Sequence, residues 1–235
     1  MTSMSQEAID LLDSLCSRAV ETIVSAKYDE SIGILTHALK TFQQEQLLLS
    51  QKEDEEDDDM EIDTSSMDIS TLQYYKSETS PKEPIFTAPL VVPCDDDTNN
   101  RETTASTEQW QFVITYNLAL SYHLCAMAQR DAKKLEVALG LWDLIYRFHW
   151  NENLGLATFH TCAILNNYGH GLRQVGADKP ARECFESLLC ALCVCVQNKG
   201  ELSSSPSGVD ACRIECFYRN ISPLVLRNPQ TAGAA

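Results

Sequence analysis

The chain has 235 residues, and its hydrophobic content of 44% is enough for one ordinary domain or two small ones. The net charge of −16 is concentrated in residues 51–109, which hold 17 acidic and 4 basic residues, while the rest of the chain is nearly neutral. The sequence has no basic cluster, so composition argues against nucleic-acid binding.

The first residues carry acids early and lack an unbroken apolar core, so they do not resemble a secretory signal. No stretch approaches the roughly 20 apolar residues that cross a bilayer. Ten cysteines in such a chain indicate a reducing compartment, where they stay as thiols or bind metal. We therefore expect an intracellular protein, cytoplasmic or nuclear, without membrane binding.

Residues 1–50 are predicted to form a helical hairpin. Apolar residues recur at steps of three and four through residues 9–26 and again through 32–42, with an interruption at the sequence SAKYDES. Ser5 stands where a capping hydroxyl is expected at the start of the first helix. Ala26 falls in the interruption, where the chain turns.

Residues 51–107 are predicted to be a disordered acidic insertion, because low hydrophobicity and high like charge do not repay the entropy of ordering. Its Ser/Thr and Pro clusters agree with this interpretation. Two short apolar islands, TLQYY and PIFTAPLVVP, are exceptions that could dock on the folded part or on a partner. A passive solvated linker is the simpler alternative.

Helical periodicity resumes after the insertion and predicts helices at about 108–128, 131–149, 153–174 and 178–197, with a last one near 208–220. Runs of alternating polarity, typical of strands, are few. The domain boundaries that follow are 108–200 for two further hairpins, 207–225 for a C-terminal capping helix and 226–235 for a disordered tail. The predicted class is all-α.

The stretch ILNNYGHGLRQVGADKPARECFESLL (164–189) closely resembles a tetratricopeptide repeat (TPR). Gly169 is the small residue of the first helix, Gly176 opens the turn and Ala181 is the small residue of the second helix. Phe185 and Leu188 follow at the spacing of the motif.

Weaker similarities cover residues 116–146 and 5–49. In the former, Ala119 and Ala138 stand farther apart than in the family, which suggests a lengthened turn. The hallmark Trp and closing Pro are missing from the best repeat. A generic helical bundle remains the alternative to a TPR-like antiparallel helical-hairpin solenoid.

The resemblance implies a protein-interaction module, an adaptor or scaffold, that binds a peptide or helix from a partner protein on its concave face. The first helices of the hairpins line that face. Carried onto this chain, with Val113 beside them, the partner-binding residues are Tyr116, Asn117, Leu120, His123, Asn166, Asn167, His170, Arg173 and Gln174.

Asn117 and Asn167 occupy matching positions in two hairpins. In family members that bind extended peptides, Asn here holds the ligand backbone, because an amide both donates and accepts hydrogen bonds. Hydrogen bonding between helices or at helix ends is the alternative role. Only Arg173 resembles the basic residues that hold chaperone C-termini in the family, so chaperone docking is not predicted.

The insertion suggests a further hypothesis, in which it occupies the concave face until a partner displaces it. Ser65, Ser66 and Ser80 resemble phosphorylation sites that would tune this exchange. Such short patterns are also common by chance.

The cysteines of the fourth predicted helix in the stretch 108–220 divide into two groups on a helical wheel. Cys184 and Cys195 fall on or beside the packing face, whereas Cys190 and Cys193 fall on the opposite side. Packing as small apolar residues is the simpler interpretation. The alternative is a zinc-stabilised or thiol-reactive protein whose metal ligands are Cys190, Cys193, Cys212 and Cys216.

Catalysis has no positive support in the sequence. The five histidines have no metal-ligand spacing, and no Gly-rich phosphate loop or nucleophile elbow occurs. We therefore expect no enzyme activity and no cofactor. Composition does not indicate an oligomeric state.

Overall fold

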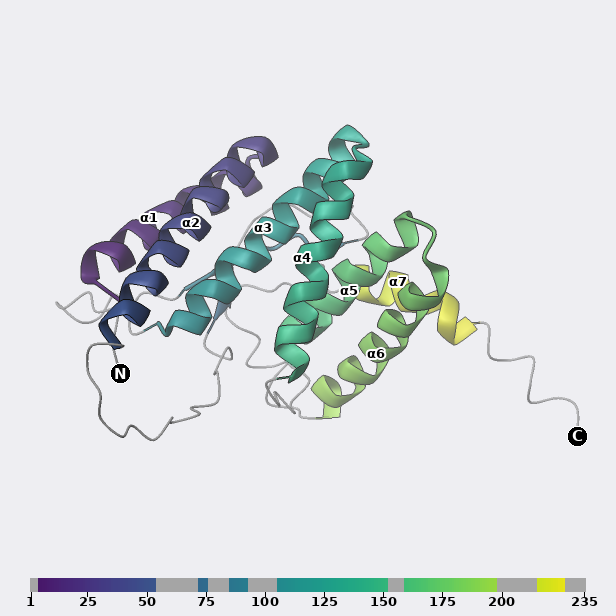
Figure 1. Cartoon of the computed structure of the whole chain (residues 1–235). Helices are drawn as coiled ribbons and strands as arrows, with labels where there is room; N and C mark the ends of the chain where they lie inside the picture. The colour runs from purple at the N-terminus through teal and green to yellow at the C-terminus, as the bar shows by residue number, and fades with distance from the viewer. Residues whose placement is uncertain are drawn as a thin grey trace, which may run out of the picture.

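A computed structural model describes residues 4–53, 72–75, 85–92, 105–151, 159–197 and 215–226. These residues are mostly helical, which confirms the predicted all-α class (Figure 1). The helices are α1 (Gln6–Val24), α2 (Tyr28–Glu53), α3 (Thr107–Gln129), α4 (Ala132–Asn151), α5 (Phe159–Gln174), α6 (Asp178–Gln197) and α7 (Glu215–Leu226), and the strands are β1 (Gln73–Tyr74) and β2 (Leu90–Val91).

The helices pack chiefly against their neighbours in the chain. The antiparallel pairs α1–α2, α3–α4 and α5–α6 stand side by side, with α2 against α3 and α4 against α5 (Figure 1). Helix α7 contacts both α5 and α6 at the end of the row. The arrangement leaves α3 and α5 on one side of the row, and this side carries the candidate site.

Each pair turns through a residue with a left-handed backbone. Ala26 has φ 57°, Arg130 has φ 56° and Gly176 has φ 76°. The predicted turns at Ala26 and Gly176 are therefore confirmed. The predicted lengthening of the turn before Ala138 is wrong, because α3 ends at Gln129 and α4 begins at Ala132, so the additional residues extend the helices.

Serine residues begin two of the helices as caps. The Ser5 hydroxyl accepts a hydrogen bond from the Ala8 N–H at 3.3 Å, as the sequence predicts. Ser106 and Gln109 form a reciprocal capping box at the start of α3. These caps satisfy backbone donors that the first turns would otherwise leave without partners.

The last helix differs from its predicted position. The structure begins α7 at Glu215 and ends it at Leu226, whereas periodicity placed it near 208–220 within the boundaries 207–225. Residues 198–214 and 227–235 lie outside the described residues, as do 152–158 at the predicted start of α5.

The insertion contributes directly to the core, which corrects the prediction of disorder for part of residues 51–107. β1 pairs antiparallel with β2, with Tyr74 opposite Leu90. Burial of these apolar islands repays the entropy of ordering them. The side chains of the two islands that are no more than 2% exposed are Leu72, Tyr74, Ile85, Phe86 and Leu90.

Candidate functional site

The side of the row formed by α3 and α5 is covered by residues 85–92, which we call the docked segment. We use the name inner face for the predicted groove residues that these two helices bury. They are Tyr116, Asn117, Leu120, His123, Asn166, Asn167 and His170, all between 0% and 5% exposed.

Two asparagines hold the main chain of the docked segment. The Leu90 N–H donates to Asn117 Oδ1 at 2.8 Å, and Asn117 Nδ2 donates to the Leu90 carbonyl at 2.8 Å. The Phe86 N–H donates to Asn167 Oδ1 at 2.7 Å, and Asn167 Nδ2 donates to the Phe86 carbonyl at 2.9 Å. The amides thus hold an extended backbone, and the peptide that they hold belongs to the same chain.

Aromatic rings surround Phe86 and anchor the docked segment. Its ring centroid lies 4.9 Å from that of Tyr74, 5.3 Å from that of Phe159 and 5.5 Å from that of Phe217. These distances are within the range of favourable aromatic pairs. β1, the docked segment, α5 and α7 therefore share one aromatic cluster.

A chain of polar side chains leads from the surface to the docked segment. Arg173 Nη2 donates to Asn220 Oδ1 at 2.7 Å, and Asn220 Nδ2 donates to Asn166 Oδ1 at 2.9 Å. Asn166 Nδ2 in turn donates to Asn167 Oδ1 at 3.2 Å. The exposed Arg173 is thereby connected through buried amides to the residue that holds Phe86.

Two buried histidines lie next to each other on the inner face. His170 Nδ1 and His123 Nε2 are 3.3 Å apart, and Trp142 Nε1 donates to His123 Nδ1 at 3.2 Å. Burial, together with the neighbouring His170, lowers the pKa of His123 to about 3. Burial and the charge of Arg173 lower the pKa of His170 to about 4. Both imidazoles are therefore neutral at pH 7.

The remaining predicted groove residues occupy different environments. Val113 is buried in the core, whereas Arg173 and Gln174 are exposed at the end of α5. Of the buried groove positions, Asn117 and Asn167 bond the docked segment directly, Tyr116 lies against Tyr74 of β1, and the two histidines contact each other and Trp142 of α4. The last turn of α5 is open to solvent.

Sequence reasoning did not identify the residues that complete this site from outside α3 and α5. Tyr74, Phe86 and Leu90 come from the insertion, while Phe217 and Asn220 come from α7. The apolar islands were the available signal for the first three residues. No comparable signal marked Asn220, because a single asparagine on a short helix has no pattern of its own.

The cysteines of α6 divide as the sequence predicts, with Cys184 and Cys195 buried and Cys190 and Cys193 exposed. The zinc alternative would need Cys216 beside the exposed pair, but Cys216 is 3% exposed and its sulfur lies 3.9 Å from Asn166 Nδ2. Cys212 lies outside the described residues. Among the residues that the structure describes, no three His, Cys, Asp or Glu side chains are grouped as metal ligands.

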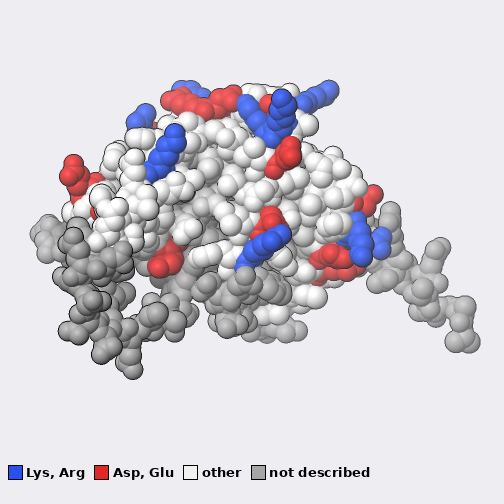
Figure 2. Space-filling model, in the orientation of Figure 1, with Lys and Arg blue, Asp and Glu red and all other residues white. Residues whose placement is uncertain are grey.

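Charge on the described helices is mixed. Figure 2 shows acidic and basic side chains interspersed over the face that it presents. The ion pairs among described residues join Lys134 to Asp29, and, within single helices, Arg147 to Asp143 and Arg219 to Glu215. None of the described helices is both long and apolar enough to cross a membrane.

The inner face offers neutral amides, aromatic rings and neutral imidazoles. Such groups bind an extended main chain and apolar side chains, because amides pair with backbone N–H and C=O groups while rings pack against side chains.

Comparison with protein-family models, curated proteins and solved structures finds no match for this chain.

Proposed function

We propose that the protein is an interaction module, an adaptor or scaffold without catalytic activity, built as a TPR-like stack of helical hairpins. Its inner face would bind an extended peptide of a partner protein. The observation that carries the proposal is the matching pair of grips by which Asn117 and Asn167 hold the backbone of Leu90 and Phe86.

The docked segment indicates the chemistry of the partner. Phe86 and Leu90 have both their backbone groups held and their side chains buried, while Ala88 between them is 3% exposed. A partner peptide would be extended, with an aromatic residue four positions before a leucine-like residue. A helical peptide would fit poorly, because its own backbone hydrogen bonds occupy the groups that the amides need.

A partner would have to displace the docked segment. Burial of a side chain such as Phe86 or Leu90 stabilises the docked conformation by about 1.5–3 kcal/mol, and each hydrogen bond adds a net stabilisation of about 1 kcal/mol. The tether adds an effective concentration in the millimolar range. The unmodified chain should therefore bind weakly in trans, and loosening the docked segment should increase its affinity for a peptide.

A fluorescent peptide of residues 84–92 (PIFTAPLVV) tests this in trans on the full chain. We expect weak binding to the natural chain and at least tenfold tighter binding to the double variant Phe86→Ala/Leu90→Ala. Adding Asn117→Ala and Asn167→Ala should abolish the gain. The variant Val137→Ala, at an exposed position on α4, is the matched control and should behave as the natural chain does.

A second peptide, N-methylated at the residues equivalent to Phe86 and Leu90, separates backbone recognition from simple apolar adhesion. It keeps every side chain but lacks the two N–H donors that the asparagine oxygens accept. Circular dichroism establishes that each variant keeps its helices. If a helical double variant binds both peptides equally well, or neither of them, the proposed recognition is wrong.

A further inference from the structure

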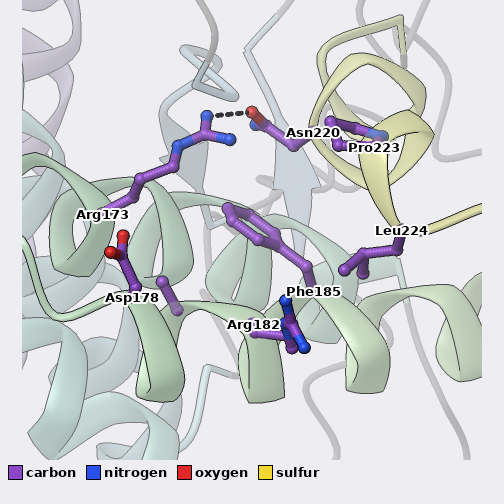
Figure 3. Close-up of a pocket in the computed structure, with 8 residues that line it drawn as sticks. Arg173, Asp178, Arg182, Phe185, Asn220, Pro223 and Leu224 are labelled. Carbon is purple, nitrogen blue, oxygen red and sulfur yellow. Dashed lines mark hydrogen bonds between the residues drawn. The ribbon is translucent and has the colours of Figure 1, made fainter. Parts of the chain in front are cut away.

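A pocket of about 320 Å³ lies between α5, α6 and α7, outside the inner face (Figure 3). Its floor is apolar and consists of Ala181 and Phe185, which are 2% and 4% exposed. Its rim is polar and exposed to solvent, with Arg173, Asp178 and Arg182. The volume is at the low end of small-molecule sites, which span about 300–1,000 Å³.

The pocket gathers positive charge in a chain whose net charge is −16. It has two arginines and one aspartate, and neither Arg173 nor Arg182 belongs to an ion pair within the described part of the chain. A guanidinium without a carboxylate partner at the mouth of an apolar pocket is well suited to an incoming oxyanion, which it can bind through two parallel hydrogen bonds.

Arg173 is already held in position for such a ligand. One of its nitrogens donates to Asn220 Oδ1 at 2.7 Å, and its guanidinium carbon lies 5.1 Å from the centroid of the Phe185 ring. Figure 3 shows Arg173 and Asn220 joined above this ring. These contacts restrict the side chain before any ligand arrives, which lowers the entropic cost of binding.

We propose that this pocket binds a small monocarboxylate with an apolar or aromatic body. The carboxylate would pair with Arg173 and Arg182, and the body would lie against Phe185 and Leu224. The charge of the site favours a carboxylate over a phosphate, because two arginines and one aspartate leave a single positive charge. A dianion would be left with an excess negative charge close to Asp178.

Calorimetric titration of the full chain with 3-phenylpropionate tests the proposal. We expect a dissociation constant below about 1 mM for the natural chain. Arg173→Gln and Arg182→Gln should each weaken binding by at least about fivefold, because each removes one charge-assisted contact. Arg219→Gln is the matched control, since Arg219 lies on α7 but pairs with Glu215 and does not line the pocket.

Two further probes separate the contributions of charge and of the apolar body. The neutral 3-phenylpropanamide keeps the body and loses the charge, so it should bind at least fivefold more weakly. Phenyl phosphate carries a dianion and should also bind more weakly. Equal binding of acid and amide, tighter binding of the phosphate, or unchanged binding by Arg182→Gln would each overturn the proposal, as would no detectable binding of the acid.

Discussion

Asn117 and Asn167 make the same two hydrogen bonds to different residues of one segment, at distances between 2.7 and 2.9 Å. Each amide accepts from a backbone N–H and donates to the carbonyl of the same residue. Because both asparagines are fully buried, these bonds form without competition from water. The docked segment is thus held by its main chain at two points and by its apolar side chains between and beside them.

Replacing Asn117 by alanine should destabilise the fold by about 2–4 kcal/mol, because the buried N–H and C=O of Leu90 would lose their partners. Urea unfolding monitored by circular dichroism measures this change. His37→Ala, at an exposed position on α2, should change stability by less than about 0.5 kcal/mol. A similar small effect for Asn117→Ala would show that the docked segment contributes little to stability.

Two glycines should respond in opposite directions to alanine. A Cβ on Gly169 would lie 2.9 Å from Phe185 Cε1 and 3.0 Å from Cys184 Cβ, so Gly169→Ala should cost about 1–3 kcal/mol. A Cβ on Gly33, inside α2, would meet no atom within 4 Å. Gly33→Ala should therefore stabilise the protein by about 0.5–1 kcal/mol through helix propensity.

Thermal unfolding of the two variants tests this difference directly. The expected melting temperature lies below that of the natural chain for Gly169→Ala and above it for Gly33→Ala. Shifts of the same sign in both variants would contradict the close packing of α5 on α6.

Acid should weaken the fold through the histidine pair. The pKa of His123 is lowered to about 3 and that of His170 to about 4, whereas an unfolded histidine titrates near 6.5. The unfolded state therefore takes up protons first as the pH falls. The free energy of unfolding is therefore unreduced above pH 6.5 and falls as the pH drops through 6.5 toward the folded pKa of each histidine, by about 2 kcal/mol per histidine at pH 5.

The variant His170→Gln separates the contribution of the histidines to the pH dependence of stability from that of the carboxylates, which also titrate in acid. Unfolding free energies at pH 7.5 and pH 5.0 should differ less in this variant than in the natural chain. His37→Ala serves as the control and should keep the natural pH dependence, because His37 is exposed. An unchanged pH dependence in His170→Gln would contradict the expected linkage.

Periodicity was sufficient to locate most helices, because amphipathic residues recur regularly wherever a helix packs on a neighbour. Gly169 and Gly176 came from the resemblance to a repeat family, and close packing at the first and a positive φ at the second restrict the side chain there. The inner-face positions Asn117 and Asn167 came from the resemblance to a repeat family, and their hydrogen bonds match the role that it implies. That they hold a partner's peptide stays a prediction.

The sequence left open whether the apolar island PIFTAPLVVP docks on the folded part, docks on a partner or stays solvated, and periodicity could not decide between these alternatives. Local composition describes the insertion as a whole, in which acids outnumber apolar residues, whereas the order of Phe86 and Leu90 depends on a surface formed by distant helices. Pairing between β1 and β2 involves only two residues on each strand, too few for a detectable alternation. Burial against helices that are distant in the sequence thus determines the conformation of residues 85–92, whereas the local composition of the insertion predicts disorder.

The cysteines should divide by reactivity under native conditions. Cys190 and Cys193 are exposed on α6, whereas burial raises the pKa of Cys184 to about 11 and those of Cys16 and Cys216 to about 12. Iodoacetamide at pH 8 followed by peptide mass spectrometry should modify the first two at least tenfold faster, since thiolate and access are both required. Equal rates would contradict the packing of α6 and α7.

The chain of amides from Arg173 to Phe86 should appear as energetic coupling between distant substitutions. Asn220 contacts Asn166, which contacts Asn167, so Asn220→Ala and Asn167→Ala act on one network. Their combined effect on stability should depart from the sum of the single effects by about 0.5–1.5 kcal/mol. Asn117 forms the other grip, on Leu90, so the effects of Asn220→Ala and Asn117→Ala should add within about 0.5 kcal/mol. Double-mutant cycles, with stability measured by urea unfolding, give both coupling energies on the same scale.

Equal coupling energies in the two cycles would mean that the effect spreads through general packing. A larger coupling energy for Asn167 would place the connection in the hydrogen-bonded amides. Arg173 would then be the surface residue through which the grip on Phe86 can be altered.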